Sequence, residues 1–156
     1  MPLFSRKDIQ FLKLCEVGST IFSTCGKRKY MAILTDDDYM VHGFGYNGGA
    51  PKSAHCEDGG CQRLEEGSES GSVYDNCIAV HAEQNAFLHS DYTSKPTKLF
   101  VNGPPCFTCA KIIVNSSVKT VFYIRDESYA KWGEISRFMK ENGVETLGFV
   151  NASAKD

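Results

Sequence analysis

The sequence lacks any long apolar run, and none of its apolar stretches approaches the roughly 18 residues that a membrane-spanning helix needs. It also lacks an excess of charge of one sign, because 17 lysines and arginines oppose 19 aspartates and glutamates. Without a basic field, we expect no membrane partner and no nucleic-acid partner. Residues 1–8 contain no apolar stretch of the secretory type, so we expect a cytoplasmic protein.

Length and composition predict one globular domain. A chain of 156 residues is about one domain long and can bury roughly two-thirds of the surface of its unfolded form. An apolar fraction of 42% and a charged fraction of 23% are ordinary for a folded domain and exclude wholesale disorder. The sequence has no internal repeat and no interdomain linker. We therefore predict a single domain over residues 1–156.

Cysteine is the unusual component, with seven in the chain. In the reducing compartment expected here, clustered cysteines are more often metal ligands or nucleophiles than disulfides. Cys15 stands alone within an apolar helical pattern, so we interpret it as a small buried residue. The other six occur in groups, and these groups carry the functional argument.

Hydrophobic periodicity and turn residues predict an alternating α/β chain. The run Asp36-Asp37-Asp38 predicts a hairpin between two strands, and Gly143 is typical of the position that follows a helix. The predicted helices are 5–24, 80–90, 106–116 and 127–142, and the predicted strands are 29–35, 39–46, 99–102, 118–124 and 144–150. Residues 47–77 are predicted to be a long irregular loop and 151–156 a frayed tail. This order favours a mixed sheet with helices on both faces.

Two short motifs open successive predicted helices. His81-Ala82-Glu83 begins the first, and Pro105-Cys106 with Cys109 begins the second. Cys106 and Cys109 share a helical face, and His81 would complete three ligands, which suits a catalytic zinc ion with its fourth position left for water. Glu83 is better placed as a proton shuttle than as a ligand. A purely structural zinc site is the alternative, but it explains neither Glu83 nor the open position, and the combined pattern is the signature of zinc-dependent deaminases.

The sequence resembles the deoxycytidylate (dCMP) deaminase family of the cytidine deaminase superfamily. The matching pieces are Ser23-Thr24-Cys25, Gly45-Tyr46-Asn47-Gly48, His55-Cys56, Gly60-Cys61, Cys77, residues 81–86 and residues 105–111. The resemblance implies a three-layer α/β/α fold around a mixed five-stranded sheet. It also implies hydrolysis of dCMP to dUMP and ammonia, which feeds dTMP synthesis. Tyr30-Met31-Ala32 departs from the Val-Gly-Ala run usual at this point in the family.

The resemblance also implies which residues contact the substrate. The backbone N–H of Ala82 would bind the pyrimidine O2, and Asn47 would bind the deoxyribose hydroxyl. Tyr129 matches a family tyrosine near the phosphate, although the surrounding segment 125–129 is atypical. A turn residue is the alternative role for Asn47, and a surface tyrosine is the alternative for Tyr129. Arg125 is a weaker phosphate candidate, better interpreted as a solvated arginine.

The four remaining cysteines bracket the long loop and suggest a second zinc ion. Cys25, Cys56, Cys61 and Cys77 could form a closed structural site, with His55 in place of one thiolate. The resemblance supports this, because several dCMP deaminases carry an extra zinc that involves the cysteine matching Cys56. Disulfides or free buried thiols are the alternatives.

The resemblance also implies effectors and an assembly, while competing activities stay open. It implies a homohexamer that dCTP with Mg²⁺ activates and dTTP inhibits. The alternatives are a deaminase of dCTP or of a 5-substituted deoxycytidylate, an inactive regulatory paralogue, and a polynucleotide-editing deaminase. Editing needs a basic channel, but the one basic cluster is Lys27-Arg28-Lys29, and an acidic run lies between residues 57 and 69. The intact Glu83 argues against an inactive paralogue.

Overall fold

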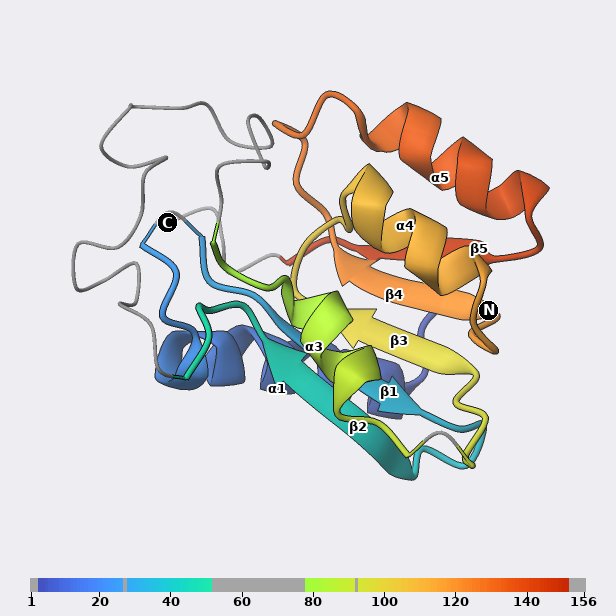
Figure 1. Cartoon of the computed structure of the whole chain (residues 1–156). Coiled ribbons are helices and arrows are strands. Elements are labelled where there is room, and N and C mark those ends of the chain that lie inside the picture. Colours follow the sequence, from blue (N-terminus) through green and yellow to red (C-terminus); the bar gives the residue numbers. More distant parts are fainter. Residues whose placement is uncertain (1–2, 27, 52–77, 92, 152–156) are drawn as a thin grey trace.

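The computed structural model describes residues 3–26, 28–51, 78–91 and 93–151. The elements along the chain are α1 (Arg6–Phe22), β1 (Met31–Thr35), β2 (Val41–Tyr46), α3 (Ala82–Leu88), β3 (Lys98–Val101), α4 (Phe107–Val114), β4 (Thr120–Ile124), α5 (Trp132–Glu141) and β5 (Glu145–Phe149) (Figure 1). Helices and strands follow one another in the order that the sequence predicts. The largest difference in a boundary is at the start of α5.

The five strands form one mixed sheet in the order β2-β1-β3-β4-β5. β1 is antiparallel to both β2 and β3, whereas β3, β4 and β5 run parallel. Val101, the last residue of β3, pairs with Ala32 near the start of β1 and with Tyr123 near the end of β4. The segment before β1 and the segments after β3 and β4 therefore meet at one edge of the sheet.

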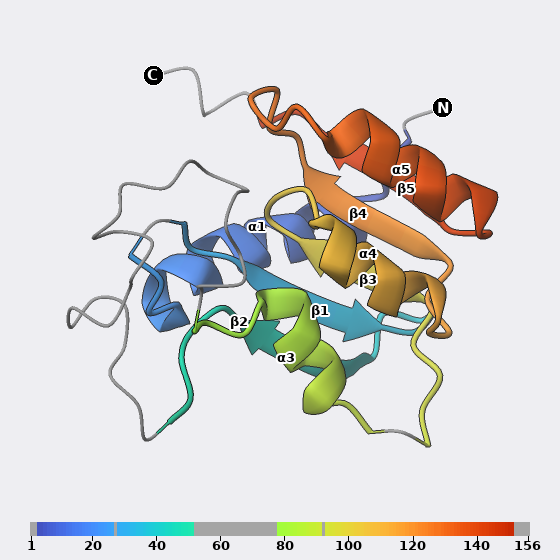
Figure 2. The ribbon, with the colours of Figure 1, turned by 45° about the horizontal axis from the view of Figure 1, so that its top comes forward.

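Helices cover both faces of the sheet, as the expected three-layer fold requires. Helix α1 lies on one face, while α3, α4 and α5 lie on the other (Figure 2). Alternate strand residues point to opposite faces, so Phe100 packs with Leu12 of α1, whereas Leu99 and Val101 pack with α3, α4 and α5. Cys15 is fully buried on the α1 face, where its thiol bonds to the carbonyl of Phe100 at 3.5 Å. Its interpretation as a small buried residue is confirmed.

Helix α5 begins at Trp132, so the predicted start at residue 127 is wrong. The carboxylate of Asp126 accepts bonds from both the N–H and the hydroxyl of Ser128, at 3.0 and 2.6 Å. The N–H of Tyr129 bonds to the carbonyl of Asp126 at 3.2 Å, which closes a turn. A side chain that satisfies the backbone locally competes with the helix. At the other end, Gly143 has a φ of +82°, as predicted for the residue that ends the helix.

The two ends of the long loop are joined by backbone bonds between Gly48 and Val80, at 2.8 and 3.2 Å. His55, Cys56, Cys61 and Cys77 lie outside the described residues, so the second zinc site stays a prediction. Its fourth candidate ligand, Cys25, is buried with a free thiol. No helix in the described parts of the chain is long and apolar enough to cross a membrane.

Candidate metal centre and active site

The three predicted zinc ligands lie together. His81 directly precedes α3, Cys106 caps the start of α4, and Cys109 lies in the first turn of α4. The Nδ1 atom of His81 is 3.3 Å from each of the two sulfur atoms, and all three donor atoms lie within 4.8 Å of one another. One imidazole nitrogen and two sulfurs at this spacing fit a zinc ion, which prefers nitrogen and sulfur ligands.

The pKa values of the two thiols of the centre shift in opposite directions. The bond between them lowers the pKa of Cys106 to about 4, with further help from His81. The same bond and burial raise the pKa of Cys109. A thiolate rather than a thiol binds a metal ion, so the lowered pKa of Cys106 suits it to a role as a metal ligand.

Glu83 is buried beside these ligands and is 5% exposed. Its Oε2 atom accepts a bond from the Cys109 thiol at 3.2 Å. Burial raises the pKa of Glu83, and the charge of Cys106 raises it further, although His81 opposes the shift. A carboxyl group with a raised pKa can take up and release a proton closer to neutral pH.

Helix α3, which directly follows His81, packs closely against strand β2. A Cβ atom on Gly45 would lie 2.4 Å from the nitrogen of Ala86 and 2.6 Å from the carbonyl oxygen of Ala82, so only glycine fits. Asn85 donates a bond from Nδ2 to the carbonyl of Tyr46 at 2.8 Å. These contacts hold the helix that follows His81 against the sheet.

The predicted substrate contacts lie around the same edge. Ala82 is buried at the start of α3. Asn47 is also buried, and its Oδ1 accepts bonds from the N–H of Tyr30 at 2.8 Å and from the hydroxyl of Ser23. Its Nδ2 donates one bond, to the carbonyl of Arg28 at 2.7 Å. Asn47 therefore ties together the segments around it, and its second amide hydrogen has no acceptor in the described parts of the chain.

Tyr129 lies on the α4 side of the centre. It lines a cavity of about 370 Å³ together with Cys106, Lys131 and Glu134. Burial raises the pKa of Tyr129 to about 12, and the nearby charge of Cys106 adds to this effect. The tyrosine is therefore an uncharged hydroxyl beside a metal ligand, and it is not a helix-surface residue because α5 begins at Trp132.

The sequence pattern does not single out Arg28 or Tyr30 as functional residues, but the structure joins their side chains. The ring of Tyr30 covers Gly103, where an added Cβ would lie 2.3 Å from the ring. Its hydroxyl accepts a bond from Nη1 of Arg28 at 3.0 Å. In the sequence, Arg28 stands out only as part of the basic cluster at residues 27–29. The sequence carries no local signal for this pair, because both residues lie before β1 and outside the strands.

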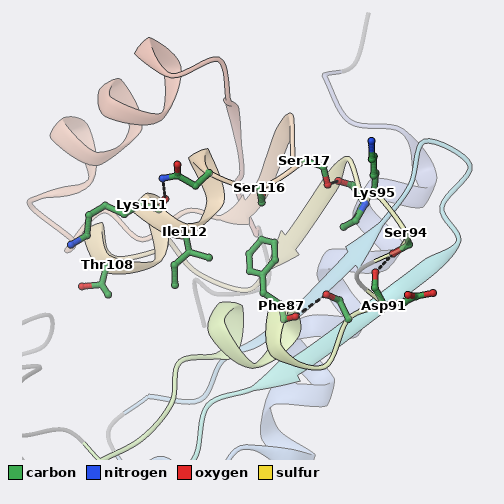
Figure 3. Close-up of a pocket in the computed structure, with 12 residues that line it drawn as sticks. Phe87, Asp91, Ser94, Lys95, Thr108, Lys111, Ile112, Ser116 and Ser117 are labelled. Atoms are coloured by element: carbon green, nitrogen blue, oxygen red, sulfur yellow. Dashed lines mark hydrogen bonds between the residues drawn. The ribbon is translucent and has the colours of Figure 1, made fainter.

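A larger groove of about 980 Å³ lies between the outer parts of α3 and α4, and Phe87 and Ile112 point into it (Figure 3). Lys95, Lys111 and Asp91 are among its lining residues. None of the three metal-binding side chains lines this groove. Of the three, Cys106 lines the smaller cavity of about 370 Å³.

Comparison with known proteins agrees with this geometry. The family model of the cytidine and deoxycytidylate deaminase zinc-binding region matches residues 5–125. The chain belongs to this family. The match includes all three candidate metal ligands and Glu83.

The individual relatives of this chain include deoxycytidylate deaminases. The deoxycytidylate deaminase of Mycobacterium phage D29 is 34% identical over 110 residues, which are 67% of this chain and 84% of the relative. The deoxycytidylate deaminase of Schizosaccharomyces pombe is 28% identical over 92% of this chain, but the chain spans only 44% of that protein. The chain thus spans about half or less of the length of several curated relatives, whereas it spans most of the phage protein.

The fold is shared with a solved phage enzyme. The dCMP deaminase of cyanophage S-TIM5, whose structure was determined in complex with dCMP and dUMP, has a TM-score of 0.69 and 22% identity. The alignment covers 95% of this chain and 100% of that chain. The deaminase-like three-layer fold predicted from the sequence is therefore confirmed.

Proposed function

We propose that the protein hydrolyses dCMP to dUMP and ammonia in a zinc-dependent reaction that feeds dTMP synthesis. The observation that carries the proposal is the buried Glu83 carboxyl beside the cluster of His81, Cys106 and Cys109. The deoxycytidylate deaminases among the relatives support the choice of substrate.

The chain's own residues account for the proton transfers. A zinc ion held by His81, Cys106 and Cys109 would supply an acidified water as the nucleophile for C4 of cytosine. Glu83 takes a proton from this water and delivers it to N3 of the pyrimidine. As the water oxygen bonds to C4, Glu83 then takes the second proton, from the new C4 hydroxyl, and passes it to the amine. The C4–N bond breaks, ammonia leaves and dUMP remains. The burial of Glu83 keeps this proton away from bulk solvent.

Three further residues would orient the nucleotide. The N–H of Ala82, at the start of α3, is proposed to bind the pyrimidine O2. The second amide hydrogen of Asn47 is proposed to bind the deoxyribose hydroxyl, since the first is bonded to Arg28. Tyr129 is proposed to lie near the phosphate, because it lines the cavity next to Cys106.

The remaining expectations extend this proposal. Cys25, Cys56, Cys61 and Cys77 would hold a second, structural zinc ion, with His55 as a substitute ligand. The single domain would assemble as a cytoplasmic homohexamer. We further propose activation by dCTP with Mg²⁺ and inhibition by dTTP. The family resemblance supports these points.

Ammonia release from a substrate panel tests the proposal. Zinc-loaded protein should deaminate dCMP faster than dCTP, deoxycytidine or 5-methyl-dCMP, and dCTP and dTTP should change the rate in opposite directions. Single-stranded oligonucleotides should release no ammonia. Deamination of oligonucleotides but not of dCMP would overturn the proposal in favour of polynucleotide editing.

A further inference from the structure

Three segments far apart in the sequence meet beside the metal centre. The register of the sheet brings the start of β1 next to the ends of β3 and β4. Arg28 and Tyr30 precede β1, Gly103 follows β3, and Asp126 follows β4. The segment with Gly103 leads directly to Cys106, so this edge of the sheet borders the proposed site.

Contacts among these residues fix the Arg28 side chain. Its Nη1 atom donates to the hydroxyl of Tyr30 at 3.0 Å and to Oδ2 of Asp126 at 2.6 Å. Asp126 is itself held by Ser128, which donates two bonds to its other carboxylate oxygen. The ring of Tyr30 packs directly against the backbone of Gly103. Two bonds at the single nitrogen Nη1 therefore fix the orientation of the guanidinium.

The opposite edge of the same guanidinium has no partner among the described residues. Within the described residues, no acceptor bonds to Nη2 or Nε of Arg28. These two nitrogens form the side edge of the guanidinium, which can donate two parallel bonds to a phosphate or a carboxylate. Because 38% of the side chain is exposed, a ligand can reach it. A fixed arginine with this edge open suits an oxyanion.

The other cations nearby fit such a ligand less well. Lys29 donates to the carbonyl of Ser23 at 2.8 Å. Arg125 is exposed and pairs with Glu127 at 2.6 Å. Lys131 lines the cavity beside Cys106 and Tyr129, but Glu134 lines it too. Among these described cations, Arg28 is the one whose side chain is held by both Tyr30 and Asp126.

We propose that Arg28 binds the 5′-phosphate of the substrate through Nη2 and Nε and so selects a mononucleotide over a nucleoside. This inference rests on the proposed function and names its specificity-determining residue. Asp126 and Tyr30 act as positioning residues, because each bonds to Nη1 and leaves the phosphate-binding edge free. The pair of Arg28 and Asp126 is neutral overall, so the selection depends on the directed N–H groups rather than on a surplus of positive charge.

The test compares dCMP with deoxycytidine as substrates of Arg28→Gln. We expect kcat/KM for dCMP to fall about 10- to 100-fold, the range of a charged hydrogen bond, while kcat/KM for deoxycytidine stays unchanged. Arg28→Lys should recover only part of the loss, because lysine keeps the charge without the paired N–H groups. Asp126→Asn should weaken the preference for dCMP to a smaller extent.

Arg125→Gln is the matched control, since it removes an exposed arginine whose partner is Glu127, and it should leave both substrates unchanged. An Arg28→Gln protein with the wild-type ratio of dCMP to deoxycytidine would overturn the inference. So would a Lys131→Gln protein that alone loses the preference. A thermal melt of each variant checks that it is folded.

A binding measurement separates this inference from the proposed function. Calorimetry with dUMP and deoxyuridine needs no turnover, and the wild type should bind dUMP more tightly by a margin that Arg28→Gln removes. If the wild type releases no ammonia from dCMP, the proposed function fails, but the inferred phosphate contact still stands or falls on this binding difference.

Discussion

The two faces of the sheet are built from different side chains. On the α1 face, aromatic rings stack, with centroids 4.7 Å apart for Phe100 and Phe122 and 5.0 Å apart for Phe11 and Phe100. On the opposite face, α3 and α4 meet the sheet through small residues, among them Ala82, Ala86 and Ala110. Small residues allow the starts of two helices to approach the strand ends closely. Both faces are thus closely packed, but only the second carries the starts of α3 and α4, where the candidate metal ligands lie.

The two faces share the same strands but are built from separate side chains. Strand β3 sends Phe100 to the aromatic face and Leu99 and Val101 to the other, and then continues to Cys106. Loss of packing on the α1 face should therefore lower stability without changing the metal ligands. Loss of a ligand should remove activity and leave the sheet intact.

The largest effect is expected for Cys106, and Cys15, a buried cysteine on the opposite face of the sheet, provides the control. Cys106→Ser removes a proposed zinc ligand, so we expect one fewer zinc ion per chain and no measurable ammonia release from dCMP. Cys15→Ala removes a fully buried thiol on the α1 face and should keep both zinc and activity. Elemental analysis and an ammonia assay on the two purified proteins measure this. Loss of zinc in Cys15→Ala, or full activity in Cys106→Ser, would contradict the separate roles of the two faces of the sheet.

Phe100→Ala tests the aromatic face and should have the next largest effect. The ring is fully buried between Phe11 and Phe122, so its truncation should lower the free energy of unfolding by about 3–5 kcal/mol. Denaturant unfolding measures the change. Phe44→Ala is the matched control, because its ring is 48% exposed and its loss should change stability by only about 0.5 kcal/mol. Equal losses in the two variants would show that the aromatic stack does not stabilise the fold.

Gly45→Ala should have a smaller effect, which acts through the position of α3. The added Cβ would meet the backbone of Ala86 and Ala82, so we expect a loss of about 1–3 kcal/mol and a lower kcat. Gly133→Ala is the control, since its added Cβ meets nothing within 4 Å, and it should be neutral or slightly stabilising. Thermal unfolding and steady-state kinetics measure both variants. A Gly45→Ala protein as stable and active as Gly133→Ala would show that the close approach is unimportant.

The metal centre could be predicted because its residues occur in short local motifs. His81 and Glu83 are two residues apart, and Cys106 and Cys109 are three apart, each pair at the start of a helix. Helix periodicity and ligand chemistry then suffice to suggest that they converge. The element order and the burial of Cys15 followed from the same local patterns.

The parts that sequence reasoning missed depend on contacts across the fold. Nothing local indicates that Arg28 meets Asp126, because strand register alone brings the two segments together. The same carboxylate explains the wrong helix start at residue 127, since its bonds to Ser128 hold a turn where periodicity favours a helix. Asn47 was expected only as a ligand of the sugar or a turn residue, whereas its amide also joins Ser23, Tyr30 and Arg28.

The most direct test of the central claim is ammonia release from dCMP by zinc-loaded Glu83→Gln beside the wild type. Glutamine keeps the size of the buried side chain but cannot carry the proton, so kcat should fall about 10²- to 10⁴-fold at unchanged zinc content. A Glu83→Gln protein with normal zinc and near-normal kcat would contradict the account, because the carboxyl buried beside Cys109 would then have no part in the reaction.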